Sequence, residues 1–387
     1  MIERVAFLSM HTCPVMQPGI GDAGGMNVYV DRLARAIAAR GIDVDVFTRR
    51  TDPAWPENQM VAESYRVVHL TAGPTEPVPT AMLGDFVPGF ALGVLDWARA
   101  NGARYDAIHS HYWLSGWAGL MIKKRLDVGL VHSFHTLGRI KDANRAAGQP
   151  TESLLRIATE HEVIECADRI VVSTPFEAGD LVEHYGARPE SIFISPPGVD
   201  HRVFQPAPRA EARERLGIGR GPLLLSVGRI QALKGVDVAI EALAIVRKHR
   251  PDARLVVIGG PSGTRGEDEV AHLHRVVADR DLGDWVEFRQ PETHAVLADY
   301  YRAADVLLMP SRTESFGLVA AEAQASGLPV VAAAVGGLAF AITDGTSGLL
   351  IEGYDPARWA AAIARIIDDP AFAAALSAGA VANAEQF

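Results

Sequence analysis

Cysteine and long apolar runs are both scarce in this sequence. Its 387 residues include only two cysteines, Cys13 and Cys166. Two are too few for a disulfide framework or a Cys-rich zinc site, and this scarcity fits a reducing compartment. No run approaches the roughly 18 consecutive apolar residues of a membrane span, and the first residues lack a signal peptide's apolar region. We therefore expect a cytoplasmic protein without a membrane span.

Positive charge is also in deficit. The chain has 37 Lys and Arg residues against 47 Asp and Glu residues, a formal net charge of -10. Proteins that bind nucleic acids generally hold the phosphate backbone with an excess of basic residues, so we expect no nucleic-acid partner, and only a local basic patch stays open. With 48% apolar and 22% charged residues, the composition is that of a soluble globular protein, long enough for two domains.

Short apolar runs alternate with helical spacing along the chain. Strands are predicted at residues 5–9 and 44–48, with a helix at 26–40 between them, which is a βαβ unit. From Leu223 the pattern restarts, with strands predicted at residues 223–227, 255–258, 286–288, 306–309, 330–333 and 349–351. The predicted fold class is therefore α/β, with two Rossmann-like, doubly wound sheets.

A turn-rich stretch at residues 196–200, followed by Pro206 and Pro208, predicts the boundary between the domains. The predicted N-terminal domain covers residues 1–200 and the C-terminal domain residues 201–370. Residues 371–387 are predicted to begin a C-terminal helical segment. Truncation of the chain at that point is left open.

Two short patterns suggest other functions and fail in context. Residues 19–24 spell the dinucleotide fingerprint G-x-G-x-x-G, but residues 11–18 intervene between the preceding strand and Gly19, and the next predicted strand runs into Arg49 and Arg50. A nicotinamide site is therefore disfavoured. The D-x-D pattern of residues 43–45 enters a strand, so we do not assign it to a metal.

The stretch from Pro310 to Glu322 carries the strongest chemical signal. An apolar strand stopped by Pro310 is followed by a helix predicted at residues 317–326, and amides around residues 315–318 are donors suited to a phosphate. Glu314 and Glu322 flank this turn, and carboxylates accept hydrogen bonds from sugar hydroxyls. The combination is typical of a sugar-nucleotide site, although acids also occur near helix N-termini for electrostatic reasons alone.

Three ordered motifs resemble the retaining family 4 glycosyltransferases. They are the Glu-x7-Glu spacing from Glu314 to Glu322, the G-R-x4-K-G element at residues 228–235, and the glycine loop at residues 21–27. The resemblance implies the glycosyltransferase B architecture, in which two Rossmann-like domains face across a cleft. It also implies that the N-terminal domain binds the acceptor and the C-terminal domain binds a nucleotide sugar.

The resemblance and the ends of the predicted strands together give a set of candidate residues. Catalytic roles are predicted for Arg229, Lys234, Glu314 and His135. Donor binding is predicted for Gly25, Arg229, Lys234, Ser315, Phe316, Gly317, Leu318, Val319 and Glu322. Acceptor binding is predicted for Asn27, Tyr112, Thr136, Lys141 and Arg156. A buried charged cluster is costly without an anion to pair with, so Lys141 and Arg156 predict a phosphorylated acceptor. No cofactor is required by this reading; no metal-ligand motif is found, and Mg²⁺ is left open.

The acceptor is predicted less sharply than the donor site. The most similar group in the family moves N-acetylglucosamine from its UDP derivative to inositol phosphate, but residues 73–90 here are shorter than that group's loop and contain no lysine. Residues 47–50 and 52–57 instead resemble sucrose-phosphate synthases, whose acceptor is fructose 6-phosphate. We predict N-acetylglucosamine or glucose transfer from a UDP-sugar to a small phosphorylated acceptor, with inositol phosphate favoured. An NADP-dependent oxidoreductase, a non-catalytic sugar-binding module and a homodimer stay open.

Overall fold

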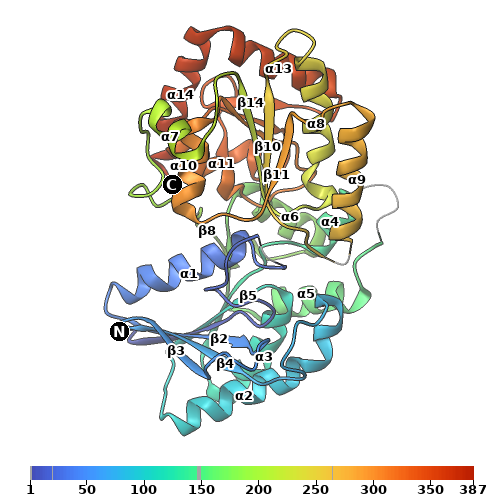
Figure 1. Ribbon diagram of the computed structural model, residues 1–387. Helices are drawn as coiled ribbons and strands as arrows, with labels where there is room; N and C mark the ends of the chain where they lie inside the picture. The colour runs from blue at the N-terminus through green and yellow to red at the C-terminus, as the bar shows by residue number, and fades with distance from the viewer. Residues whose placement is uncertain (1, 20, 146–149, 264) are drawn as a thin grey trace. The chain divides into compact units, whose positions relative to one another are not determined.

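The computed structural model describes residues 2–19, 21–145, 150–263 and 265–387, and the chain folds into two compact units. Unit 1 comprises residues 1–18 and 23–195, and unit 2 comprises residues 19–22 and 196–387. Most of unit 1 is blue to green in Figure 1, and most of unit 2 is yellow to red. Each unit has its own sheet and its own apolar cores, so each is described separately.

The sheet of unit 1 has the strand order β3-β4-β2-β1-β5-β6-β7-β8. The strands are β1 (Arg4–Leu8), β2 (Asp43–Arg49), β3 (Asn58–Ala62), β4 (Tyr65–Leu70), β5 (Ala107–His111), β6 (Gly129–Ser133), β7 (Arg169–Val172) and β8 (Ile192–Ile194). Every neighbouring pair in the described sheet is parallel except β3 and β4, which pair antiparallel at one edge. The carboxyl ends of β1, β5 and β6 therefore lie along one edge of the sheet.

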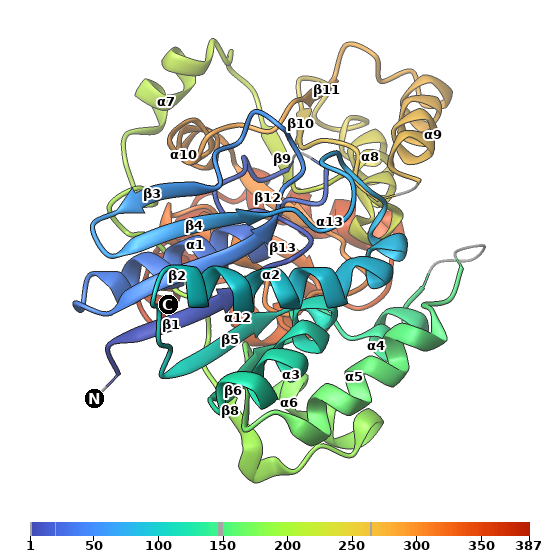
Figure 2. The same cartoon turned by 90° about the horizontal axis from the view of Figure 1, so that it is seen from below.

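Helices cover both faces of this sheet. Helix α1 packs on one face and α2 and α3 on the other (Figures 1 and 2), with a separate apolar core on each side. The helices of unit 1 are α1 (Gly25–Ala38), η1 (Thr80–Phe86), α2 (Val87–Ala100), α3 (Trp113–Leu126), α4 (Gly138–Ala143), α5 (Leu154–Cys166), α6 (Pro175–Tyr185) and η2 (Pro189–Ser191), where η marks a 3₁₀ helix. Two covered faces explain why the central strands are nearly continuous apolar runs.

The sheet of unit 2 is parallel throughout its described strands, in the order β11-β10-β9-β12-β13-β14. The strands are β9 (Leu223–Val227), β10 (Arg254–Ile258), β11 (Val286–Arg289), β12 (Val306–Met309), β13 (Val330–Ala333) and β14 (Gly348–Ile351). This order reverses direction at β9 and β12. In open α/β sheets, ligands bind at the strand ends beside such a reversal.

Helices also cover both faces of the unit 2 sheet. Residues of α8, α9 and α13 build one apolar core, and residues of α10 and α11 build the other. The helices are α7 (Arg209–Leu216), η3 (Ala232–Lys234), α8 (Val236–Val246), α9 (Gly266–Asp279), α10 (His294–Ala303), α11 (Leu318–Ala325), α12 (Leu338–Ala341), α13 (Pro356–Asp368) and α14 (Pro370–Ala384). The predicted α/β class with two doubly wound units is confirmed.

Two parts of unit 1 differ from the sequence prediction. Strands β3 and β4 were not predicted. Strand β3 lies at the sheet edge with four of its five residues exposed and lacks a clear apolar pattern, whereas β4 is largely buried and its apolar residues were overlooked. Residues 73–90 were treated as a loop, but they contain η1 and the first turn of α2. Pro88 near the start of α2 is tolerated there because its missing N–H would have no partner within the helix.

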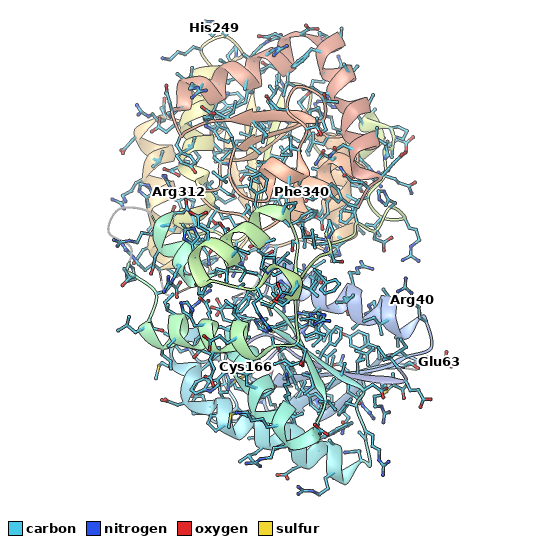
Figure 3. All side chains as sticks on the ribbon, turned by 180° about the vertical axis from the view of Figure 1, so that it is seen from behind. Arg40, Glu63, Cys166, His249, Arg312 and Phe340 are labelled. Carbon is cyan, nitrogen blue, oxygen red and sulfur yellow. The ribbon has the colours of Figure 1, made fainter. Side chains whose placement is uncertain are left out.

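The segment Thr80–Ala100 also differs from the expectation that no apolar run approaches a membrane span. It is long and apolar enough to cross a membrane by length and composition alone. However, Val87, Phe90 and Val94 are buried in the core of unit 1, which identifies α2 as a core helix in this structure. Cys13 is buried and Cys166 is exposed at the end of α5 (Figure 3), and both are free thiols.

Candidate active site

In unit 2, a tight turn joins β12 to α11. Pro310 ends the strand, and Gly317 caps the helix with a φ of 93°, a left-handed conformation that favours glycine. Gly336 and Gly337 pack against the backbone of this turn, where a β-carbon at either position would overlap residues 314–316. The Gly337 amide also donates to the Glu314 carbonyl over 2.8 Å. Glycines thus allow close packing behind the turn, and the first amides of α11 have no acceptor within the helix.

Lys234 and Glu314, which are 80 residues apart, form an ion pair beside this turn. The Ser311 hydroxyl donates to the same Glu314 oxygen over 3.2 Å. Lys234 ends η3, and the next residue, Gly235, is left-handed and packs against the Pro310 carbonyl. The lysine and glutamate side chains are 25% and 15% exposed, so the pair remains accessible to water and to a ligand. The structure therefore brings these two predicted residues together.

Glu322 lies on α11 and is only 6% exposed. The hydroxyl of Tyr301, on α10, donates to Glu322 Oε2 over 3.0 Å. Burial, and then the adjacent Glu322 carboxylate, raise the pKa of the Tyr301 hydroxyl well above its usual range, so the phenol remains a donor. Sequence reasoning missed Tyr301, since nothing in the local pattern distinguishes it from the other core aromatic residues of α10.

Arg229 follows strand β9 and contacts residues that the sequence analysis grouped with glycine-rich loops. Its Nη1 donates to Ser262 Oγ over 3.3 Å and to the Asp22 carbonyl over 3.5 Å. Gln231 Nε2 donates to the same serine oxygen over 3.1 Å. Among the described contacts, the guanidinium is therefore oriented at the end of β9 by neutral oxygens.

In unit 1, the backbone is strained where two neighbouring strands end. Tyr112 follows β5 with a φ of 73°, and His135 lies two residues after β6 with a φ of 60°. Positive φ is uncommon for residues other than glycine, and such strain concentrates at functional sites. His111 Nδ1 and His135 Nε2 lie 3.1 Å apart, so a hydrogen bond links the two strand ends.

Four histidines cluster at these strand ends with strongly lowered basicity. Burial lowers the pKa of His109 and of His135 to about 3, and burial together with the neighbouring histidines lowers the pKa of His111 and His132 well below its usual range. His109 contacts Ser133 Oγ at 3.0 Å and His132 contacts Ser110 Oγ at 2.7 Å. These serine contacts indicate a structural role for His109 and His132. His135 is neutral at pH 7 and can exchange hydrogen bonds with hydroxyls.

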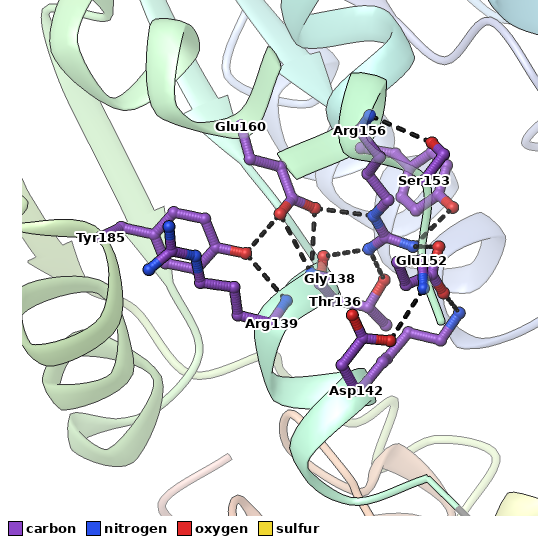
Figure 4. Close-up of polar contacts among 11 residues, drawn as sticks. Thr136, Gly138, Arg139, Asp142, Glu152, Ser153, Arg156, Glu160 and Tyr185 are labelled. Carbon is purple, nitrogen blue, oxygen red and sulfur yellow. Dashed lines mark hydrogen bonds and ion pairs between the residues drawn. The ribbon is translucent and has the colours of Figure 1, made fainter. Parts of the chain in front are cut away.

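Arg156 is the centre of a buried polar cluster in unit 1, shown in Figure 4. Its Nε donates to Glu160 over 2.7 Å, and its Nη2 donates to the carbonyl and hydroxyl oxygens of Thr136 over 2.9 and 3.1 Å. Its Nη1 lies 3.2 Å from the Tyr112 hydroxyl and 3.1 Å from Glu152 Oε2. The structure thus brings together three of the predicted acceptor residues, namely Arg156, Tyr112 and Thr136.

Lys141 is a fourth residue predicted to bind the acceptor. It joins the same cluster through an ion pair with Glu152. Burial opposes charge on Glu152, but Arg156 and Lys141 outweigh burial and lower the pKa of the Glu152 carboxyl. Burial alone would likewise lower the pKa of Arg156, but its neighbours Tyr112, Glu160 and Glu152 raise it above the ordinary value. Both shifts favour the charged forms of Glu152 and Arg156.

This cluster corrects one argument from the sequence. We reasoned that buried cations here would need an external anion, but Glu152 and Glu160 already supply two carboxylates. Glu160 is completely buried and accepts from the Gly138 amide at 3.1 Å and from the Tyr185 hydroxyl. A signal for both glutamates was present, because Glu152, Arg156 and Glu160 follow one another at intervals of four residues.

Two predicted residues lie at the start of α1. Gly25 is its first residue and is exposed. Asn27 is buried, and its Nδ2 donates to Thr12 Oγ1 over 2.7 Å and to the Cys13 carbonyl over 2.6 Å, while its Oδ1 accepts from the Gly24 amide. Asn27 therefore holds the segment after β1 against the helix, and its role toward an acceptor stays a prediction.

The acidic pair Asp43 and Asp45 is occupied by arginines. Arg4 lies 3.0 Å from Asp43, and Arg66 lies 2.7 Å from Asp45. Across the described residues, no group of three or more His, Cys, Asp or Glu side chains is arranged to hold a metal ion. The D-x-D residues therefore stabilise the sheet of unit 1, and a metal requirement stays untested.

Comparisons with known proteins agree with this arrangement. The family model described as Glycosyltransferase Family 4 matches residues 23–203, and the model described as Glycosyl transferases group 1 matches residues 208–382. The D-inositol 3-phosphate glycosyltransferase of Thermobispora bispora is 47% identical over 392 aligned positions, which span 100% of this chain and 91% of that protein.

Solved structures are similar over nearly the full length. A sucrose-phosphate synthase from Thermosynechococcus elongatus superimposes with a TM-score of 0.93 at 34% identity, covering 99% of this chain and 94% of that one. Anabaena HepE, solved in complex with UDP and glucose, has a TM-score of 0.79 at 21% identity over 99% of this chain and 95% of that one, which supports the fold alone. The chain belongs to the family 4 glycosyltransferases, with the two Rossmann-like domains of the glycosyltransferase B fold.

Proposed function

We propose that this glycosyltransferase moves a hexose, N-acetylglucosamine or glucose, from a UDP-sugar to a small phosphorylated acceptor with retention of the anomeric configuration. The observation that carries the donor half is the ion pair of Lys234 with Glu314 beside the glycine-backed turn before α11. Inositol phosphate is the favoured acceptor because the relative from Thermobispora bispora is named for it.

Unit 2 supplies the groups that we assign to the donor. The amides of residues 315–319 and the cations of Arg229 and Lys234 would bind the diphosphate, since a helix N-terminus and positive side chains both favour phosphate. Glu322, held by Tyr301, would accept hydrogen bonds from the ribose hydroxyls. Glu314 would contact the transferred hexose once the diphosphate competes for Lys234.

The diphosphate is the leaving group, so its negative charge grows as the glycosidic bond breaks. Groups that hold this charge more strongly in the transition state than in the ground state accelerate the reaction. In the retaining route implied by the family, the leaving phosphate helps to remove the acceptor proton on the same face of the sugar. We assign neutral His135 to a hydroxyl of the transferred sugar, and no cofactor is required in this scheme.

Unit 1 supplies the groups that we assign to the acceptor. The hydroxyls of Tyr112 and Thr136 accept from Arg156, so each keeps its own proton to donate to a phosphate oxygen. Lys141 would add a mobile positive charge. Gly25 and Asn27, at the start of α1, would complete the donor and acceptor contacts of this segment.

A second acceptor is favoured by a separate observation. The TM-score of 0.93 and 34% identity with a sucrose-phosphate synthase support fructose 6-phosphate as the alternative. The oxidoreductase alternative would require binding of a nicotinamide cofactor, and the sugar-binding-module alternative would require absence of turnover.

A product screen tests the proposal. UDP-N-acetylglucosamine, UDP-glucose and GDP-mannose are each incubated with inositol phosphates, fructose 6-phosphate and unphosphorylated inositol, and products are identified by mass. We expect transfer from a UDP-sugar to a phosphorylated acceptor only, with the anomeric configuration of the product read by NMR. Equal use of the unphosphorylated acceptor, or an inverted product, would contradict the proposal. Thermal stabilisation by NADPH but not UDP would favour the oxidoreductase instead.

A further inference from the structure

The guanidinium of Arg156 has no spare donor in this structure. Its three nitrogens carry five N–H groups. These face five oxygens, contributed by Glu160, Tyr112, Glu152 and, twice, Thr136, at distances between 2.7 and 3.2 Å. Any anion that binds directly to Arg156 must therefore replace one of these partners.

Only one of the charged partners is able to leave. The Glu160 side chain is 0% exposed and is fixed by the Gly138 amide and the Tyr185 hydroxyl. The Glu152 side chain is 22% exposed, and its second oxygen pairs with Lys141, which is 32% exposed. Breaking the Glu152 contacts returns its carboxylate to water, whereas releasing Glu160 would leave a charge buried.

The charges of the four side chains joined by these ion pairs also cancel. Arg156 and Lys141 contribute two positive charges, and Glu152 and Glu160 contribute two negative charges. A phosphate ester that approaches Arg156 and Lys141 finds their side-chain nitrogens already in contact with the Glu152 carboxylate. With Glu152 displaced, the same two cations face a ligand that can carry two negative charges and offers three acceptor oxygens.

We propose that Glu152 is an internal occupant of the acceptor's phosphate site, which the phosphate displaces from Arg156 and Lys141 on binding. This inference rests on the proposed phosphorylated acceptor and adds a specificity-determining residue to that site. In the free protein Glu152 gives both cations a partner, and in the complex it is replaced by an anion of higher charge. A dianionic phosphate ester competes with Glu152 more strongly than a monoanionic ligand does, so Glu152 selects for phosphate.

The test compares Glu152→Gln with two controls. Glu152→Asp keeps the competing charge, and Glu165→Gln removes one negative charge from an exposed position on α5, the helix that carries Arg156. Affinities for inorganic phosphate, inositol monophosphate and fructose 6-phosphate are measured by calorimetry with UDP present. We expect Glu152→Gln to bind phosphate esters about tenfold more tightly, the gain of roughly one charged contact. Glu152→Asp should stay nearer to wild type and Glu165→Gln should match it.

Two results would overturn the inference. Weaker or unchanged phosphate binding by Glu152→Gln would mean that Glu152 orients Lys141 and Arg156 and does not compete. A gain of equal size in Glu165→Gln would mean that general electrostatics, not displacement, sets the affinity. Failure of the proposed function has a different signature, because then neither wild type nor Glu152→Gln binds any phosphate ester while both still bind UDP.

Discussion

The two units of this glycosyltransferase hold their charged site residues in different ways. In unit 1, Arg156 is 2% exposed and is packed between two carboxylates, two hydroxyls and a carbonyl. In unit 2, the Lys234–Glu314 pair is 25% and 15% exposed and is backed by glycines. Arg156 and Glu160 are thus part of the folded core, whereas the Lys234–Glu314 pair lies where a ligand can reach it. Equivalent substitutions should therefore have different consequences.

The largest expected effect is on stability in unit 1. Arg156→Ala leaves the fully buried Glu160 without its cation, and breaking a buried pair from one side typically costs about 3–5 kcal/mol. We expect a clear loss of unfolding free energy by calorimetry, partly restored by adding Glu160→Gln. A loss below about 1 kcal/mol would show that the cluster is not part of the core.

This expectation changes how the acceptor assignment should be tested. Arg156→Ala would raise the acceptor's Michaelis constant, but it would also damage the fold. Arg156→Lys retains the charge and loses the bidentate geometry, so it separates the two effects. A raised Michaelis constant with unchanged UDP affinity in Arg156→Lys supports the acceptor role, and unchanged kinetics would contradict it.

The second effect is on catalysis in unit 2. Lys234→Ala removes a partly exposed cation, so we expect stability to change by less than about 1 kcal/mol. Turnover relative to donor affinity should fall by about ten- to a hundredfold, because a charged hydrogen bond to the leaving diphosphate is lost. Two quantities are measured for the variant and the wild type, namely kcat/KM for the UDP-sugar and the free energy of unfolding. Unchanged kinetics in the folded variant would remove Lys234 from the diphosphate site.

A third, smaller effect separates the units by pH. The pKa values of His111 and His132 are depressed in the folded state, so the stability linked to them is present above their unfolded value of about 6.5 and is lost as pH falls toward their folded values. Buried Glu177 acts in the opposite sense, because burial raises its pKa to about 7 and the linked stability is lost as pH rises through that value. Two buried imidazoles outweigh one carboxyl.

Unit 1 should therefore lose about 1.4 kcal/mol per pH unit below pH 6.5, the value of one net proton. His109 and His135 are partly exposed, so their contribution to this loss of stability is not counted. Hydrogen exchange is measured at pH 7 and pH 5 and corrected for the intrinsic rate. On going to pH 5, the opening of β5 and β6 should accelerate more than the opening of β9 and β12. Equal changes in both sheets would contradict the assignment, and Glu177→Gln should steepen the loss in unit 1.

The sequence predicted the parts of the molecule that depend on local patterns. Strands β12 and β13 have the predicted bounds, because buried parallel strands are uninterrupted apolar runs with clear stops such as Pro310. Strand β3 could not be predicted, since an exposed edge strand has little hydrophobic pattern. Lys234 and Glu314 were each predicted from a separate motif, and only the fold brings them into contact.

The residues that sequence reasoning missed are partners of the predicted ones. Tyr301 and Tyr185 lie 21 and 25 positions from the glutamates they contact, and their roles depend on how helices pack. Such contacts leave no short-range signal. The pairing of Arg156 was missed for another reason, because the spacing of Glu152 and Glu160 four residues to either side was not used, and the sequence therefore suggested an external anion where the fold supplies two carboxylates.

The smallest expected effect tests whether the buried hydrogen bond between Tyr301 and Glu322 serves the proposed nucleotide site of unit 2. Tyr301→Phe removes the donor that fixes Glu322 but keeps the ring, so the loss should be one hydrogen bond, roughly 0.5–1.5 kcal/mol. If Glu322 binds the ribose, the dissociation constant for UDP should rise about two- to tenfold by calorimetry, and the rise should vanish in a Glu322→Gln background because the oriented carboxylate is already absent. Tyr300→Phe, on the same helix, is the matched control, since the described contacts give its hydroxyl no hydrogen-bond partner. If Tyr301→Phe left UDP binding unchanged while lowering stability, Tyr301 would be a core residue only, and any contact of Glu322 with the nucleotide would not depend on the tyrosine hydroxyl.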